Sequence, residues 1–301
     1  MADILEAVFK RHGCLNSQPQ TGDQSVFCNR STECSSVVVA GERGISRALL
    51  FLAAVTAAAD LDLKVLFYTH TAIQKFPVPV NETMTDLKPD SLKKIKFVYR
   101  RSLEELLLDV ASQHELASGA AASAPSLVLV DGLDSYLHGI GVGGGGGSGG
   151  GSGVGSGGSR KDEMSTTAHL AALLMDTSSF LTRIHEEMAD SRGMERGAVI
   201  PCRVIASYHS DVEAMTADPV LGVLDRYFPT RCTLVKDAGS SGGGDEFAHE
   251  WQVYLSGTGV RHGAANELEW YLVVHANGAM EFSPITKPVA PRNPDQQMER
   301  V

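Results

Sequence analysis

The sequence predicts an α/β fold: a mostly parallel sheet with helices on both faces and an antiparallel hairpin near the C-terminus. Two short apolar runs, 37–40 and 127–130, are typical of strands that are buried on both faces. Strand and helix patterns alternate over 36–138, as expected for a doubly wound sheet. Residues 276–279, Ala-Asn-Gly-Ala, form a tight-turn signal between two strand patterns. With 301 residues, 43% of them hydrophobic, the chain can bury the core of such a fold.

The elements follow from periodicity along the chain. Apolar residues at helical spacing predict one short N-terminal helix over 4–9, followed by a mobile tail to residue 35. Strands are expected at 37–41, 64–68, 95–99, 127–131, 204–207, 233–235, 250–255, 269–274 and 280–283. Helices are expected over 49–59, 103–114 and 165–188.

Three segments divide the chain. We expect a helix and tail at 1–35, a core at 36–287 and a disordered proline-containing tail at 288–301. The core is interrupted at 139–159 by an almost pure glycine and serine segment, which is expected to behave as a flexible linker. A second flexible loop is expected at 240–244.

Composition limits the classes of function. No apolar run is long enough for a membrane span, and the N-terminus lacks a basic flank and an apolar signal core, so we expect an intracellular protein without a membrane partner. The five cysteines have no CxxC pairs and no matching histidine spacing, so they are expected to be reduced thiols rather than zinc ligands. The net charge of −10 gives no whole-chain support for nucleic-acid binding.

A glycine-containing loop follows the first apolar strand. The order of strand, tight loop and helix is the order that a phosphate-binding loop needs, because backbone N–H groups and the helix N-terminus then converge on the phosphates. Against the pattern GxxxxGK(S/T), Gly41 is kept, whereas Ser46, Arg47 and Ala48 stand where glycine, lysine and a hydroxyl residue belong. The alternative is that Gly41 and Gly44 only turn a strand into a helix.

Asp131 ends the second apolar strand. A carboxylate in that position can help to hold Mg²⁺ at the end of a Walker B strand. An ordinary parallel strand followed by a turn aspartate would look the same, so the prediction depends on the pairing of this strand with the glycine loop.

The densest basic stretch lies before and along the third predicted strand. Interleaved with Phe97 and Tyr99, it would suit phosphate contacts and base stacking by single-stranded DNA. Its candidate DNA-binding residues are Lys93, Lys94, Lys96, Arg100 and Arg101. The alternative is a solvated strand edge with no ligand.

Several separated segments together resemble the ATPase subunit of the metazoan Shu complex, a RecA-family recombinase paralogue. The resemblance covers roughly 36–138 and 165–287 and leaves the tail and the linker unmatched. The matching segments are LKKIKF at 92–97, APSLVLVDGL at 124–133, AALLMDT at 171–177, RYFP at 226–229 and EW at 269–270.

The resemblance implies a RecA-like P-loop NTPase core that acts in homologous-recombination DNA repair in the nucleus. The implied partners are a SWIM-domain zinc protein, the recombinase with its paralogues, and single-stranded DNA. The implied cofactors are ATP and Mg²⁺, with Asp131 as the catalytic carboxylate, which would hold the metal through water. The residues expected to face the nucleotide are Gly41, Gly44, Ser46, Arg47 and Ala48.

Departures from the family pattern leave open whether the chain is an enzyme. Arg47 is a planar fork rather than a compact ammonium, and Ala48 has no oxygen for Mg²⁺. His70 stands near the position at which related ATPases carry a water-activating glutamate. We therefore expect weak or absent ATP hydrolysis. The alternatives are a non-catalytic RecA-fold scaffold and an unrelated P-loop ATPase without a DNA role.

Overall fold

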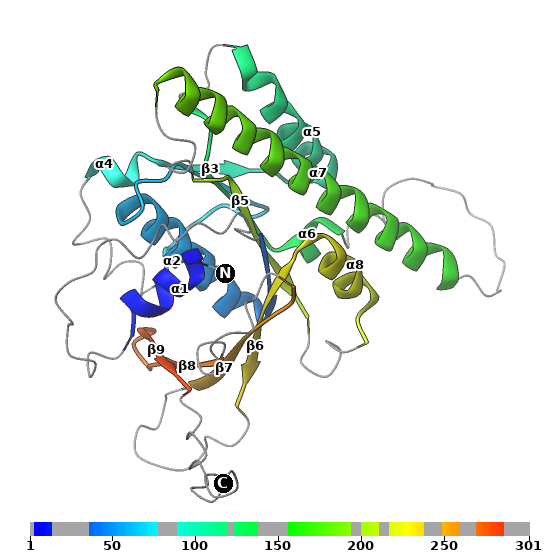
Figure 1. Ribbon diagram of the computed structural model, residues 1–301. Helices are drawn as coiled ribbons and strands as arrows, with labels where there is room; N and C mark the ends of the chain where they lie inside the picture. Colours follow the sequence, from blue (N-terminus) through cyan, green and yellow to red (C-terminus); the bar gives the residue numbers. More distant parts are fainter. Residues whose placement is uncertain are drawn as a thin grey trace, which may run out of the picture.

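A nine-stranded sheet with helices packed on both faces forms the body of the molecule (Figure 1). The computed structural model describes residues 3–13, 36–77, 89–118, 123–137, 156–193, 200–210, 217–237, 249–258 and 269–285. The strands are β1 (Val37–Gly41), β2 (Val65–Thr69), β3 (Ile95–Tyr99), β4 (Leu127–Asp131), β5 (Arg203–His209), β6 (Thr230–Lys236), β7 (His249–Ser256), β8 (Glu269–Val274) and β9 (Met280–Pro284). The α-helices are α1 (Asp3–Arg11), α2 (Arg43–Ala59), α4 (Pro89–Leu92), α5 (Leu103–Ser112), α6 (Leu133–Leu137), α7 (Ser156–Ser191) and α8 (Pro219–Tyr227), and a 3₁₀ helix, η2, covers Gln113–Ser118.

The strand order is β3-β2-β4-β5-β1-β6-β7-β8-β9. The first six strands in this order are parallel, and β6 to β9 are antiparallel. This arrangement confirms the predicted fold class. Every residue of β1, β2 and β4 is buried, which explains why these strands are continuous apolar runs rather than alternating ones.

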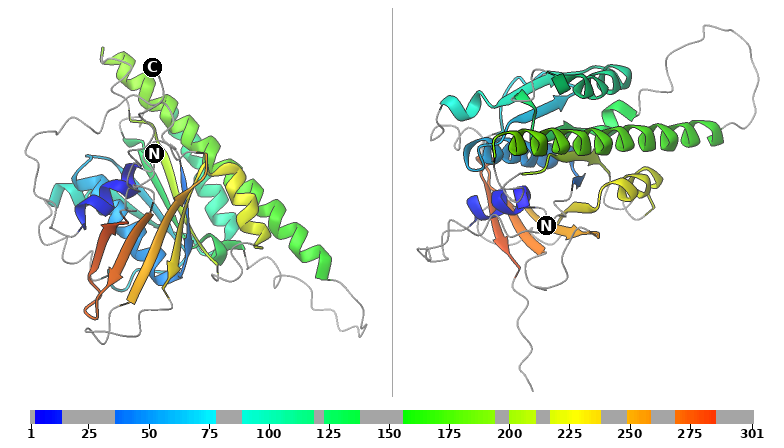
Figure 2. Two further views of the ribbon diagram at one scale, coloured as in Figure 1. Left: turned by 60° about the horizontal axis from the view of Figure 1, so that its bottom comes forward. Right: turned by 45° about the horizontal axis from the view of Figure 1, so that its top comes forward.

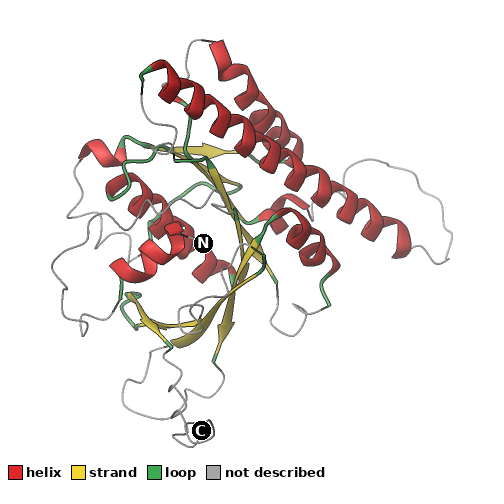
Figure 3. Cartoon of the chain, viewed as in Figure 1, coloured by secondary structure: helices red, strands yellow, loops and turns green. Residues whose placement is uncertain are grey.

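Helices lie on both faces of the sheet (Figure 2), and an apolar cluster packs between the sheet and the helices on each face. One cluster contains α1, α2 and the inner face of the antiparallel strands. The other contains α5, α6, α7 and α8. Figure 3 shows the same division, with helices on each side of the strands. Helices on both faces were therefore predicted correctly.

The N-terminal helix differs from its predicted place outside the core. Ile4, Leu5, Val8 and Phe9 are all buried in the cluster with α2. The chain after α1 also pairs with the sheet, because the Phe282 N–H donates to the His12 carbonyl at 2.9 Å. The helix is amphipathic, and burying its apolar stripe is what attaches it to the sheet. The rest of the predicted tail, 14–35, lies outside the described residues.

The long helix α7 begins at Ser156, so it takes in the last residues of the predicted glycine and serine linker. The remainder of that linker lies outside the described residues, as do the predicted loop at 240–244 and the tail at 288–301. The predicted turn before β9 is present: Gly278 has a φ of 85°, which glycine adopts without strain, and the His275 N–H donates to the Ala279 carbonyl at 2.9 Å.

Candidate functional site

The carboxyl ends of β1, β2, β4 and β5 lie at one edge of the parallel sheet, where α/β proteins place their ligands. These strands end at Gly41, Thr69, Asp131 and His209. Because β5 lies between β1 and β4, Gly41 and Asp131 are on strands that are not neighbours. The predicted site residues are therefore assembled by the topology rather than by sequence proximity.

The connection between β1 and α2 is a single residue, Glu42. Its backbone is extended, with φ −62° and ψ 133°, and its carbonyl accepts from the Ser46 N–H at 3.0 Å. The helix therefore begins at Arg43, and the predicted loop residues Gly44 to Ala48 lie in its first two turns. A glycine at the position of Ser46 would have favoured a looped path, whereas the actual residues allow the helix to start early.

Gly41 has a packing role at the end of β1. A Cβ built on this residue would lie 2.7 Å from the Leu234 Cβ and 3.0 Å from the Leu234 carbonyl oxygen. The close approach of β1 to β6 thus accounts for this glycine without a ligand. Gly44, inside α2, has only an ordinary contact of 3.7 Å from such a Cβ, to the Glu42 carboxylate.

Arg47 reaches across the edge of the sheet and pairs with Asp131. Its Nε donates to Asp131 Oδ2 at 2.7 Å, and its Nη2 donates to the hydroxyls of Thr69 at 3.1 Å and Thr71 at 2.6 Å. The Asp131 side chain is 6% exposed and that of Arg47 is 31% exposed. The arginine that stands where a P-loop has its lysine is thus directed at the carboxylate expected to face Mg²⁺.

Asp131 accepts further bonds from its neighbours. Thr69 Oγ1 lies 3.1 Å from Oδ2, and Ser207 Oγ lies 3.5 Å from Oδ1 while it also accepts from the Gly132 N–H at 2.8 Å. Burial raises the pKa of the Asp131 carboxyl, and the charge of Arg47 and the Thr69 hydrogen bond oppose that rise. The carboxylate is therefore paired and hydrogen-bonded, as a buried charge needs to be.

A second arginine of α2 makes a parallel contact. Arg43 forms an ion pair with Asp134, which is buried in α6. Asp134 Oδ1 also accepts from the His209 N–H at 3.1 Å, and His209 Nδ1 lies 3.1 Å from the Gly41 carbonyl, to which it donates. The first turn of α2 is thereby connected to α6 and to the ends of β5 and β1.

The residues at this edge do not fit a magnesium nucleotide. A phosphate-binding loop needs a run of backbone N–H groups between strand and helix, and here that run is one residue long. Ala48 supplies no oxygen, and Asp131 is engaged by Arg47, Thr69 and Ser207. Within the described ranges, no three histidine, cysteine, aspartate or glutamate side chains gather as a metal site.

His70, which stands near the position of the glutamate in related ATPases, is packed against a neighbour. It follows β2 and meets the Tyr136 ring edge-on, with ring centroids 5.5 Å apart. Farther along α2, Phe51 is buried and stacks on Phe67 with centroids 4.8 Å apart, and Ala54 is buried as well. Core packing therefore accounts for this part of α2.

The five candidate DNA-binding residues lie on or beside β3, an edge strand of the sheet. Three of them already have acidic partners: Lys93 pairs with Asp90 at 2.8 Å, Lys94 with Asp62, and Arg100 with Asp109 at 2.6 Å. In contrast, neither the Lys96 ammonium nor the Arg101 guanidinium, both exposed, contacts an acid among the described residues. The structure thus separates the basic stretch into paired and unpaired cations.

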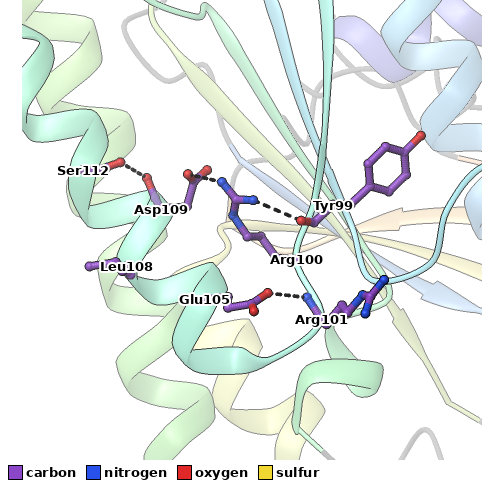
Figure 4. Close-up of a pocket in the computed structure, with 7 residues that line it drawn as sticks. All are labelled: Tyr99, Arg100, Arg101, Glu105, Leu108, Asp109 and Ser112. Atoms are coloured by element: carbon purple, nitrogen blue, oxygen red, sulfur yellow. Dashed lines mark hydrogen bonds and ion pairs between the residues drawn. The ribbon is translucent and has the colours of Figure 1, made fainter.

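A surface pocket of about 620 Å³ lies beside Arg101 (Figure 4). Tyr99, 43% exposed, and Leu108, 74% exposed, line it together with Glu105. Glu105 is engaged at the start of α5, where its carboxylate accepts from the Arg101 N–H at 2.8 Å and its own N–H donates to Ser102 Oγ at 3.2 Å. Of the lining side chains, Arg100 reaches across to Asp109 of α5, whereas the Tyr99 ring points away from α5 (Figure 4).

Sequence reasoning missed several members of the site at the sheet edge. Arg43 and Asp134 were not predicted, and neither were the hydroxyls of Thr69, Thr71 and Ser207. A signal was present in two polar residues of buried strands, Thr69 at the end of β2 and Ser207 within β5. The pairing of Arg43 with α6 depends on strand order, which no local pattern provides.

The fold and the site together define an α/β protein with a mostly parallel sheet, in which two arginines pair with buried carboxylates at the carboxyl ends of the strands. Comparison with known proteins gives the relatives named ATPase SWSAP1. The mouse protein is 32% identical over 202 residues, which cover 67% of this chain and 59% of the mouse protein's length. The human protein is 30% identical over 238 residues, which cover 79% of this chain and 83% of the human protein. The chain belongs to the SWSAP1 family.

No protein-family model matches the chain. Among solved structures, a KaiC-like protein from Pyrococcus horikoshii is similar with a TM-score of 0.49 and 9% identity, over 83% of this chain and 89% of the archaeal chain.

Proposed function

We propose that this chain is a recombinase-paralogue subunit of a Shu-type complex in homologous-recombination repair, and that it hydrolyses ATP weakly or not at all. Its partners in this role are a SWIM-domain zinc protein, the recombinase with its paralogues, and single-stranded DNA, in the nucleus. Membership of the SWSAP1 family supports the recombination role. Among the described residues, no helix is long and apolar enough to cross a membrane.

The observation that supports a low rate of ATP hydrolysis is the contact between Arg47 and Asp131. Hydrolysis of ATP by a P-loop enzyme needs Mg²⁺ to bridge the phosphates, and the metal needs a carboxylate that is free to hold it. At 2.7 Å the guanidinium lies where it neutralises that carboxylate directly. Because Arg47 is covalently part of the chain, it competes with a metal at an effectively constant local concentration.

DNA binding in this proposal depends on the unpaired cations beside β3. A phosphate contact gains affinity by releasing counterions, and a cation already paired with a carboxylate gains less from it. Lys96 and Arg101 are therefore the main phosphate contacts, and the exposed Tyr99 ring is the surface on which a base stacks. Lys93, Lys94 and Arg100 contribute less, because each has an acidic partner.

ATP turnover by the complex with the SWIM-domain partner tests the proposal. Phosphate release is measured with and without single-stranded DNA for the natural chain, for Asp131→Asn and for the matched exposed control Asp90→Asn. We expect equal, near-background rates in all three, with DNA binding present. DNA-stimulated turnover that Asp131→Asn abolishes and Asp90→Asn keeps would instead establish an enzyme. Loss of DNA binding from all preparations would favour a P-loop protein with no DNA role.

A further inference from the structure

Two ion pairs at the sheet edge join elements that a bound nucleotide and metal would otherwise bring together. Arg47 connects α2 to β2 through Thr69 and to β4 through Asp131, with contacts of 3.1 and 2.7 Å. Arg43 connects the start of α2 to Asp134 in α6, and Asp134 in turn binds the backbone of β5. Both carboxylates are almost completely buried, so their charges are balanced inside the protein.

We infer that Arg47 and Arg43 hold α2 against the strand ends with positive charges that belong to the chain itself. The fold, and the packing of α2 against the strand ends, then require neither nucleotide nor divalent metal. This inference rests on the proposed function and adds how its site is regulated: ATP is not a switch for this subunit. Arg47 and Arg43 are positioning residues in this role, since they act through the placement of α2.

The geometry gives a physical reason for insensitivity to nucleotide. A ligand shifts a conformational equilibrium only by its differential affinity for the two states. Before Mg²⁺ could reach Asp131, Arg47 would have to leave three oxygen partners, and the Asp131 carboxylate would stay buried without its counter-charge in the meantime. The single-residue β1–α2 connection offers a phosphate too few N–H groups to offset that loss.

The test measures thermal unfolding and amide hydrogen exchange of the full 301-residue chain, with its SWIM-domain partner, in EDTA and in Mg²⁺ with a non-hydrolysable ATP analogue. A ligand at about a hundred times its Kd would raise the Tm of a domain of this size by roughly 5–10 °C. We expect a shift within about 1 °C and unchanged exchange over residues 43–59. A nucleotide-dependent rise in Tm, or slower exchange in this helix, would overturn the inference.

Three variants test whether Arg47 holds α2 against the strand ends, a role that we call the tether. Arg47→Met removes the charge and the fork of donors, and we expect it to lower the Tm by several degrees and to speed exchange over 43–59. Arg47→Lys, which keeps the charge but not the fork, should fall between Arg47→Met and the natural chain. Arg183→Met is the matched control, because Arg183 is 65% exposed on α7, where it lies 3.9 Å from Glu187 and over the Phe180 ring. Equal stability of Arg47→Met and Arg183→Met would also overturn the inference.

The two proposals fail separately. Absence of turnover together with nucleotide-induced stabilisation would refute the tether and leave the proposed function standing. DNA-stimulated turnover well above background that Asp131→Asn abolishes and Asp90→Asn keeps would refute the low turnover of the proposed function, whatever the stability of the variants.

Discussion

Truncation of Phe9 tests whether the N-terminal helix is part of the core. The Phe9 side chain is fully buried, and its ring lies 5.3 Å from that of Trp270 and 4.8 Å from that of Phe282. Replacing a buried phenylalanine by alanine costs about 3–5 kcal/mol, through lost transfer free energy and the cavity that is left. Against a total stability of about 5–15 kcal/mol, this is a large fraction.

The expected effect of Phe9→Ala is a fall in Tm of roughly 6–20 °C, since each kcal/mol moves the Tm of a domain of this size by roughly 2–4 °C. Thermal unfolding followed by circular dichroism measures it. Lys10→Ala is the matched control, because the Lys10 side chain is 63% exposed in the same helix. Phe9→Leu should lose less than Phe9→Ala and stays measurable if the alanine variant does not fold. If Phe9→Ala and Lys10→Ala melted at the same temperature, α1 could not be packed as described.

Three further predictions concern DNA, pH and the linker. Replacing Lys96 or Arg101 by alanine should weaken single-stranded DNA binding and lower its salt dependence, whereas Lys93→Ala should change both less. Fluorescence anisotropy across a salt series measures the affinities. Equal losses of affinity in the three variants would contradict the division into paired and unpaired cations. Burial lowers the pKa of His185, so the unfolded state binds the proton first as the pH falls, and the free energy of unfolding decreases below about pH 6.5. In denaturant titrations, His185→Gln should make the free energy of unfolding depend less on pH. An unchanged pH dependence would refute a role of His185 in it. Deleting 141–155 should leave both the Tm and DNA binding unchanged, and loss of either would show that the segment is more than a linker.

The parallel part of the fold could be predicted because its strands are recognisable one at a time. A strand buried on both faces must be apolar along its length, and this pattern identifies β1, β2 and β4 in the sequence. The place of α1 could not be predicted. An amphipathic pattern indicates that one face of a helix is buried, but it does not indicate which other element that face packs against. The short helices α4 and α6 span four and five residues, too few for a periodic pattern to show.

The site was predicted in its members more than in its arrangement. Gly41, Arg47 and Asp131 do lie at one edge of the sheet, as strand ends in an α/β fold must. The contact of Arg47 with Asp131 was not predicted, since it depends on where α2 begins, and helix boundaries are set by competition between a loop and one more helical turn. The division of the basic stretch was also beyond the sequence, because Lys94 pairs with Asp62, thirty-two positions away.

The order of the strands has a consequence for the synthesis of the chain. β5 is made after the glycine and serine segment, yet it occupies the gap between β1 and β4, and the neighbour of the N-terminal helix, β9, is among the last parts to be made. At a ribosome that adds roughly 5–20 residues per second, the first strands wait exposed for several seconds with an empty position between them. The nascent chain therefore has to be kept from aggregating until its second half arrives, and a product terminated before β5 would lack the strand that joins β1 to β4.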